Sequence, residues 1–305
     1  MNSADIQKLR ELFADRLQEQ VPLAGYTSAR IGGSADVLLI VRSADELATT
    51  ATHVWKLGVP VTLLGGGSNV LVSDRGVRGV VLINRARLLK FDSQSDLPSV
   101  YAESGATLND IVQRAARLGL GGLEWAASVP GSLGGAVYGN AGAFGGEMAG
   151  NLVSVEVLHQ ERGRETWPVE KMGYGYRTSI LKSEPQPVFI LAATLHLSYG
   201  KAVDIQTRMS GFSERRRHTQ PPGASMGSMF KNPPGDKAGR LIEAAGLKGT
   251  RIGAAEVSTQ HANFFINTAN TRAEDMKTLL ELVQATVFSK FGVRLEPEVE
   301  LIGEW

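Results

Sequence analysis

The 305-residue sequence contains no cysteine, which excludes disulfide bonds, thiolate nucleophiles and cysteine-bound metals. It also lacks any apolar run near the roughly 20 residues that a membrane span requires. Neither sign of charge is in excess, because 32 Lys and Arg stand against 31 Asp and Glu, giving a net charge of +1. The sequence therefore indicates no nucleic-acid-binding surface and no membrane segment.

Metal ligands and a secretion signal are also missing. The five histidines are widely spaced and form no H-E-x-x-H pattern, so we expect no metal site. The first residues mix acidic and basic side chains where a secretory signal would place a basic stretch before an apolar core. A cysteine-free chain agrees with a reducing compartment, so we expect a cytoplasmic protein, and we see no sign of an obligatory protein partner.

The pattern of apolar residues predicts an α+β protein. Helical periodicity or capping boxes indicate helices near residues 5–18, 43–58, 107–119, 204–217, 241–245 and 271–287. Strands are indicated at residues 59–64, 70–72, 77–83, 100–103, 153–159, 188–197 and 294–302. Because these elements mix without regular βαβ alternation, α+β is favoured over a doubly wound sheet, and the length allows two or three domains.

Glycine, with 35 residues, is concentrated in a few stretches. Residues 65–69, Gly-Gly-Gly-Ser-Asn, follow a predicted strand, so their main-chain N–H groups could converge on an anion; a plain tight turn is the structural alternative. Residues 128–142 form a second glycine-rich stretch without periodicity. Two such segments suit a long cofactor that contains a pyrophosphate.

Familiar nucleotide and hydrolase motifs do not account for these stretches. No G-x-G-x-x-G follows a strand and no G-x-x-x-x-G-K-[ST] is present, so neither a Rossmann nor a P-loop site is indicated. Gly223-Ala-Ser225-Met-Gly227 matches the nucleophile elbow of hydrolases, with His261 downstream. That elbow requires a strand before it and a helix after it, whereas prolines flank it here, so a hydrolase is disfavoured.

Taken together, the motifs resemble the UDP-N-acetylenolpyruvylglucosamine reductase (MurB) family, in its shorter form, over nearly the whole chain. The pieces that carry this resemblance are Ser28-Ala-Arg30-Ile-Gly-Gly33, Leu64-Gly-Gly-Gly-Ser-Asn69, Val129-Pro-Gly-Ser-Leu-Gly-Gly135, Asn140-Ala-Gly-Ala143, Tyr176-Arg-Thr-Ser179, Gly227-Ser-Met-Phe-Lys-Asn-Pro233, Ala238-Gly-Arg-Leu-Ile-Glu243, His261-Ala-Asn-Phe-Phe-Ile-Asn267 and Pro297-Glu-Val299.

The resemblance implies a two-lobed FAD-binding domain of the vanillyl-alcohol-oxidase (PCMH) type and a C-terminal α+β substrate-binding domain. Lobe 1 with the N-terminal helix would cover residues 1–86, lobe 2 residues 87–200, and the substrate-binding domain residues 201–305. The family's cofactor contacts would fall on Arg30, Gly65, Gly66, Gly67, Ser68, Asn69, Pro130, Gly131, Ser132, Gly134, Gly135, Asn140 and Ala141.

The implied activity is reduction of UDP-N-acetylglucosamine enolpyruvate to UDP-N-acetylmuramate, a peptidoglycan precursor, with NADPH as reductant and FAD as carrier. Arg177 and Glu298 match the residues that stabilise the enolate, and Ser228 matches the proton donor. Tyr176, Lys231 and Asn232 match substrate contacts. From residue type alone, an ion-paired arginine, turn serine and surface glutamate are the structural alternatives.

One position departs from the family pattern, and two other functions compete. Glu300 stands where the family commonly has an arginine, which puts a second cation at the substrate carboxylate in doubt. A flavin oxidase or dehydrogenase of the same fold is the nearest alternative, because fold alone does not fix function. A nucleotide-binding module without catalysis is the second; its protein would be colourless, or yellow and not bleached by NADPH.

Overall fold

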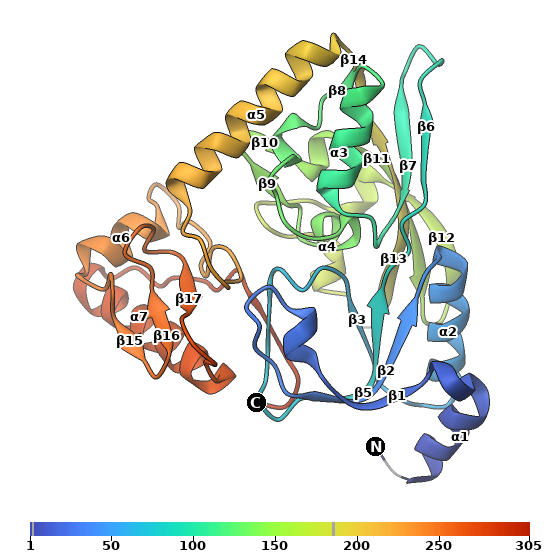
Figure 1. The fold of residues 1–305 in the computed structure, drawn as a ribbon, viewed down its shortest axis with the longest axis horizontal. Helices are drawn as coiled ribbons and strands as arrows, with labels where there is room; N and C mark the ends of the chain where they lie inside the picture. Colours follow the sequence, from blue (N-terminus) through green and yellow to red (C-terminus); the bar gives the residue numbers. More distant parts are fainter. Residues whose placement is uncertain (2, 185–186) are drawn as a thin grey trace. The chain divides into compact units, whose positions relative to one another are not determined.

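The computed structural model describes Met1, residues 3–184 and residues 187–305, which fold into two compact units (Figure 1). Unit 1 comprises Met1–Leu17, Leu39–Gly66 and Val80–Arg216; unit 2 comprises Gln18–Leu38, Gly67–Gly79 and Arg217–Trp305. Two of the boundaries between the units fall inside strands, one in β2 (Ser34–Val41) and one in β5 (Val77–Asn84). The predicted lobes at 1–86, 87–200 and 201–305 stay a prediction.

Unit 1 is built on a five-stranded antiparallel sheet in the order β12-β11-β13-β7-β6. The strands span Gly163–Pro168, Leu152–His159, Val188–His196, Ser99–Glu103 and Leu89–Asp92, respectively. Central strand β13 is buried over most of its length because helices α2 (Ala44–Lys56) and α4 (Leu133–Tyr138) both pack on it. A parallel pair, β3 (Val61–Leu64) with the second half of β5, completes the main β structure of this unit.

Two helices of unit 1, α2 and α3, begin directly after the polar N-cap residues that the sequence indicates. Ser43 accepts a hydrogen bond from the N–H of Glu46 at the start of α2, and Thr107 accepts one from Asp110 at the start of α3 (Leu108–Arg117). The buried face of α3 lies in the main core with Trp125 and Trp167. Other elements are α1 (Ser3–Phe13), α5 (Ala202–Thr219), the pairs β8 (Leu120–Gly121) with β14 (Ser198–Tyr199) and β9 (Gly142–Ala143) with β10 (Gly146–Glu147), and 3-10 turns at Ala14–Arg16, Glu124–Ala126, Met148–Gly150, Val169–Met172 and Ile180–Lys182.

An ion pair between a buried carboxylate and a half-exposed arginine ties α5 to the rest of unit 1. The Glu124 side chain is 10% exposed and accepts bonds from Arg208 Nη2 at 2.6 Å, Arg208 Nε at 3.1 Å and the N–H of Gly122 at 2.7 Å. Burial alone would raise the pKa of Glu124, but the hydrogen bonds from Arg208 and the main chain outweigh it and lower the pKa below its usual value.

We expect the Arg208→Met variant to lose about 1–3 kcal/mol of stability at neutral pH, because a buried carboxylate would lose its charged donor. In the native chain the lowered pKa makes this pair stabilising above the ordinary pKa of 4.5, and the contribution is lost as pH falls through the folded pKa. Urea unfolding between about pH 3 and 7 checks this. Native and variant stabilities should converge at the acid end; a pH-independent difference would contradict it.

Unit 2 contains three small β structures. β1 (Gln18–Pro22) pairs antiparallel with β2, β4 (Val70–Val72) pairs parallel with β18 (Glu300–Ile302), and β15 (Arg251–Ile252), β16 (Ala255–Val257) and β17 (Phe265–Asn267) form an antiparallel sheet. Helices α6 (Ala238–Ala244) and α7 (Ala273–Phe291), with a 3-10 turn at Leu23–Tyr26, complete the unit. Its core combines Ala29, Ile31 and Leu71 with apolar residues after position 225.

Two sequence predictions in unit 2 are wrong. The capping box at residues 271–274 does not form, because Arg272 is the N-cap without a side-chain bond and Asp74 instead accepts the N–H groups of Ala273 (2.8 Å) and Glu274 (3.1 Å). The strand predicted at 294–302 is confined to Glu300–Ile302. Residues 296–298 instead pair with residues 229–231 through an isolated bridge between Pro297 and Phe230.

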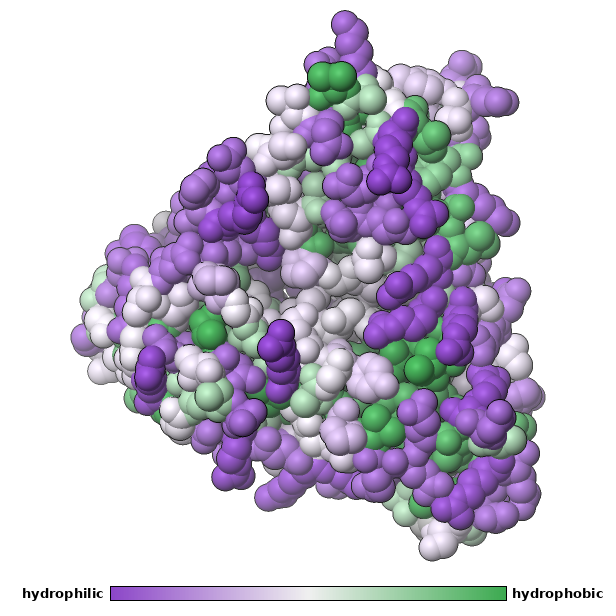
Figure 2. Space-filling model, viewed as in Figure 1, coloured by the Kyte–Doolittle hydropathy of each residue, from purple (hydrophilic) through white to green (hydrophobic). Residues whose placement is uncertain are grey.

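The sequence did not predict several other elements. These are the short helix α4 and the strands β1, β2, β6, β8, β9, β10, β12, β14, β15, β16 and β17. Hydrophilic residues are spread over the face seen in Figure 2, with smaller hydrophobic areas between them. Among the described residues, no helix is long and apolar enough to cross a membrane.

Candidate functional site

The two glycine-rich stretches meet within unit 1. A Cβ atom on Gly66 would lie 2.8 Å from the Cα of Gly131, and one on Gly65 would collide with Ser132 Oγ. Because these contacts are with main chain and with a buried serine, only glycine allows the approach. The resulting cradle, defined here as residues 65–66 with 130–135, presents main chain where side chains would otherwise stand.

Neighbouring main chain fixes the second half of this cradle. The N–H of Leu133 donates to Ala106 O and that of Gly134 to Ser104 O, both at 2.8 Å. Ser132 Oγ accepts from the N–H of Gly135 at 3.4 Å. Four positions before Ser132 in the sequence, the buried hydroxyl Ser128 Oγ has no hydrogen-bond partner among the described residues. A close-packed glycine cradle with a buried unsatisfied hydroxyl fits a bound cofactor that supplies phosphate or ring acceptors.

The remaining glycine-loop residues belong to unit 2. Gly67 has φ +59, and a Cβ there would collide with Tyr26 O, so this position also requires glycine. Asn69 Nδ2 donates to Glu298 O at 3.0 Å, while Asn69 O accepts from the N–H of Glu300 at 3.0 Å. Arg30 is exposed in a left-handed conformation, with φ +56. The loop is thereby joined to the segment that carries Glu298.

Arg177 lies in a tight turn of unit 1 closed by main-chain bonds between Gly175 and Thr178. Its φ is +57, a left-handed conformation that costs a non-glycine residue free energy and is found disproportionately at functional sites. Its Nη2 donates to Gly142 O at 2.7 Å, and its guanidinium lies 5.7 Å from the ring centre of Tyr176, which is exposed. The arginine is thus held at a defined place beside the 140–143 segment.

Three further bonds join the 174–179 turn to residues 137–142. Tyr174 Oη donates to Val137 O at 2.8 Å, Ser179 Oγ donates to Tyr138 O at 2.6 Å, and Asn140 Nδ2 donates to Gly175 O at 3.0 Å. Burial raises the pKa of the Tyr174 hydroxyl, which keeps it a donor. The predicted cofactor residues Asn140 and Ala141 therefore share one framework with Arg177. The Asn140 side chain is only 2% exposed, and its Oδ1 also accepts the N–H of Ala149.

Ser228 and Glu298 lie on neighbouring segments of unit 2. Ser228 bridges to Phe264 on one side, and the N–H of Glu298 donates to Met229 O at 2.8 Å on the other. Lys231, adjoining this segment, donates its N–H to Glu296 O and pairs through Nζ with the Glu296 carboxylate. Asn232 Oδ1 accepts the N–H of Ala238 at 3.1 Å, which caps α6. Four of the predicted site residues thus meet within one unit.

The hydrolase alternative gains no support. Within the described range 220–237, which holds Ser225, there is neither a helix nor a strand, so the strand-turn-helix of a nucleophile elbow is absent. His261 Nδ1 accepts the N–H of Asn263 at 3.2 Å, and burial lowers the pKa of His261. No group of three or more His, Asp or Glu in the described part of the chain is placed to hold a metal ion.

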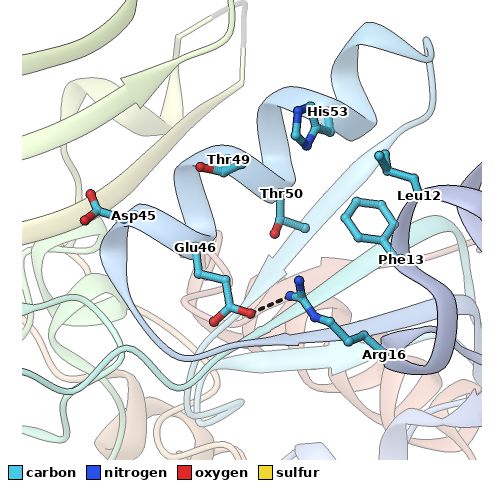
Figure 3. A pocket seen from close by; sticks show the side chains of 8 residues that line it. All are labelled: Leu12, Phe13, Arg16, Asp45, Glu46, Thr49, Thr50 and His53. Carbon is cyan, nitrogen blue, oxygen red and sulfur yellow. Dashed lines mark hydrogen bonds and ion pairs between the residues drawn. The ribbon is translucent and has the colours of Figure 1, made fainter.

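A surface cavity of about 370 Å³ lies elsewhere in unit 1, between α1 and α2 (Figure 3). Its lining includes His53, Thr50 and the ion pair of Arg16 with Glu46, drawn as a dashed line in Figure 3. None of the sequence-predicted site residues lines it. It is a groove beside the N-terminal helix and adds nothing to the glycine cradle.

Supporting residues that the sequence did not single out include Asn263, Ser104 and Tyr174. Asn263 stands inside a quoted motif, and Tyr174 precedes one by two residues, so a signal for both existed. Ser104 acts through its main-chain carbonyl, for which residue type carries no signal.

Comparison with known proteins matches most of the chain. Residues 35–167 match the family model of the FAD binding domain, and residues 218–302 match that of the UDP-N-acetylenolpyruvoylglucosamine reductase C-terminal domain. The UDP-N-acetylenolpyruvoylglucosamine reductase of Chloroflexus aggregans is 39% identical over 96% of this chain and 100% of its own; that of Rubrobacter xylanophilus is 44% identical over 93% and 94%. The crystal structure of the enzyme from Thermus caldophilus has a TM-score of 0.80 at 36% identity, covering 94% of this chain and 99% of that one.

Proposed function

Because the chain belongs to the UDP-N-acetylenolpyruvoylglucosamine reductase family, we propose that it reduces UDP-N-acetylglucosamine enolpyruvate to UDP-N-acetylmuramate with electrons from NADPH. The observation that carries this proposal is the relationship at 39–44% identity along nearly the full length of relatives that bear this name. The same matches confirm the predicted family, the FAD cofactor and the α+β fold with an FAD-binding domain and a C-terminal domain.

FAD supplies the hydride chemistry when it is bound, taking a hydride from NADPH and passing it to the enolpyruvyl group. The cradle of residues 65–66 and 130–135 supports a role in holding the pyrophosphate, because its glycines leave main-chain N–H groups accessible at close range. Ser128 Oγ is buried and has no hydrogen-bond partner among the described residues, so it is proposed to donate to an acceptor on the cofactor. Gly67, Ser68, Asn69, Arg30, Asn140 and Ala141 are proposed as the further contacts.

We expect the Gly66→Ala variant to bind FAD more weakly, by about 5- to 150-fold in Kd, because the added Cβ would overpack against Gly131 by about 1–3 kcal/mol. The Kd is measured by titrating the apoprotein with FAD and following quenching of flavin fluorescence. Gly150→Ala is the matched control, since its Cβ would meet open space. Equal affinities for the two variants would contradict the assignment of the cradle.

Arg177 is proposed to meet the substrate carboxylate, onto which charge moves when the β-carbon receives hydride. A guanidinium presents two parallel donors to a carboxylate, and a fixed cation stabilises the enolate more than the ground state. The framework that holds Arg177 at Gly142 supports this role, since a preorganised donor needs little rearrangement during the reaction. Tyr176, exposed beside it, is proposed to contact the sugar nucleotide.

Ser228 is proposed to give its proton to the α-carbon, and Glu298 to hydrogen-bond the substrate carboxylate. Their adjacency supports a shared task, because the Glu298 main chain bonds directly to the residue after Ser228. Lys231 and Asn232 follow on the same segment and are proposed to contact the nucleotide phosphates or uridine. Nucleotide substrates and a cysteine-free chain both point to the cytoplasm as the place of action.

The experiment that tests the function follows the visible spectrum of the purified holoenzyme. We expect NADPH to bleach the flavin bands and the enolpyruvyl UDP-sugar to restore them anaerobically. Bleaching without restoration by the sugar would contradict the proposal and favour a flavin oxidase or dehydrogenase for another substrate.

A further inference from the structure

The carboxamide of Asn263 binds the main chain of Phe230 at both of its ends. Oδ1 accepts the N–H of Phe230 at 3.0 Å, and Nδ2 donates to Phe230 O at 2.8 Å. Asn263 is only 3% exposed, so neither bond is exchanged easily for one with water. The side chain thus pairs with Phe230 as a neighbouring strand would.

The local chain path explains why a side chain is used here. The N–H of Met229 donates to Asn263 O at 2.8 Å, which is an ordinary main-chain bond. The chain turns next to this point, since the N–H of Phe264 donates to His261 O and that of Asn263 donates to His261 Nδ1. The Asn263 carboxamide therefore extends the pairing from Met229 to Phe230.

The pairing on the opposite side leaves the polar main-chain groups of Phe230 for Asn263. Phe230 and Pro297 form a non-hydrogen-bonded antiparallel pair, flanked by the bonds from Lys231 N–H to Glu296 O and from Glu298 N–H to Met229 O. The N–H and C=O of Phe230 therefore point away from Pro297. The adjacent bond, from the N–H of Glu298 to Met229 O at 2.8 Å, places Glu298 opposite Met229, the residue that follows Ser228. A slip of the 228–231 segment would move Ser228 relative to Glu298, and Asn263 opposes that slip from the other side.

We propose that Asn263 is a positioning residue of the reductase, which fixes the 228–231 segment, and with it Ser228, against the segment that carries Glu298 for proton delivery to the substrate. The inference rests on the proposed function. It assigns Asn263 to the sugar half-reaction only, because NADPH oxidation requires no proton from Ser228.

The test is Asn263→Asp, which replaces the NH2 group of the carboxamide with a carboxylate oxygen and keeps the shape of the side chain. We expect reoxidation of the reduced holoenzyme by the enolpyruvyl UDP-sugar to slow about 100-fold at about pH 8, because misplacement of about 1 Å costs that much. Flavin reduction by NADPH is expected to stay within about twofold of the native rate. Stopped-flow absorbance measures both steps.

The same variant carries an internal control through pH. A buried carboxyl has a raised pKa, so the carboxyl introduced by Asn263→Asp should be protonated at about pH 5. The protonated carboxyl again offers a donor to Phe230 O. The reoxidation rate should therefore rise about tenfold from its value at about pH 8. His261, Lys231, Glu296 and Glu298 also stand on the surrounding segments, so each rate is divided by that of the native chain at the same pH. A defect in folding would slow both half-reactions together, whereas the positioning role predicts loss and recovery in reoxidation alone.

Two further variants keep the inference falsifiable. Asn263→Ser introduces no charge and should slow reoxidation without recovering at low pH. Asn151→Asp is the matched control in unit 1, where Asn151 Nδ2 donates to Gly122 O and His196 O, and it should leave both half-reactions unchanged.

Three results would overturn the positioning role of Asn263. They are an equal loss of both half-reactions, native rates in Asn263→Asp, and failure of both Asn263 variants to fold. If the native holoenzyme itself were not reoxidised by the sugar, the proposed function would fail instead, which separates the two conclusions.

Discussion

Replacing Ser228 with alanine is expected to slow reoxidation of the reduced enzyme by the enolpyruvyl UDP-sugar about 10³-fold. A positioned general acid contributes about 10²- to 10⁴-fold, and no other hydroxyl on residues 227–231 can take over the proton. Reduction of the flavin by NADPH should be unchanged, since it does not use this proton. Rapid-mixing absorbance of each half-reaction makes the measurement.

Ser225 gives the matched control for this variant, because it lies three residues earlier in the same loop and is the serine of the apparent hydrolase elbow. Ser225→Ala should keep both half-reactions at native rates. If Ser225→Ala were the inactive variant and Ser228→Ala the active one, the assignment of the proton donor would be wrong.

Substitution of Arg177 by glutamine is expected to lower kcat/KM for the sugar by about 10²- to 10³-fold, the usual cost of removing one donor aimed at a developing oxyanion. Arg177→Lys should recover only a small part, since an ammonium offers a point charge where a planar guanidinium offers two parallel donors. Steady-state kinetics at saturating NADPH measures the effect on kcat and KM separately.

Arg164→Gln is the control for loss of a positive charge from unit 1, because Arg164 forms a surface ion pair with Asp45. It should change kcat/KM by less than about twofold, in line with the small contribution of exposed ion pairs. A defect in Arg177→Gln that appeared equally in flavin reduction by NADPH would contradict a role specific to the substrate carboxylate.

The sequence predicted those helix starts correctly that depend on contacts between residues close together in the chain. The cap of α2 is made by Ser43 and Glu46, three residues apart, and was predicted correctly. The predicted cap of α7 was wrong because Asp74, 199 positions before Ala273, accepts the main-chain N–H at the start of the helix. No pattern within one segment reveals such a partner. Strand β2, by contrast, was overlooked although its apolar run at residues 37–41 indicated it.

The candidate site shows the same division. Backbone crowding at the glycine cradle was predictable, since clustered glycine implies close approach. The supports around Arg177 and Ser228 were not, because they join residues such as Asn140 with Gly175 and Asn263 with Phe230 through tertiary contacts. Catalytic identities came from family motifs, and their assignment to roles remains a proposal.

The discontinuity of unit 2 has a consequence for biosynthesis. Ala29, Ile31 and Leu71 emerge early from the ribosome, yet their apolar partners and the strand that pairs with β4 lie in the last third of the chain. Contacts so distant in sequence form slowly, and exposed apolar surface in the nascent chain invites aggregation. We therefore expect unit 2 to complete its folding only after the last third of this sequence has been synthesised, which leaves the apolar side chains of Ala29, Ile31 and Leu71 without their partners until then.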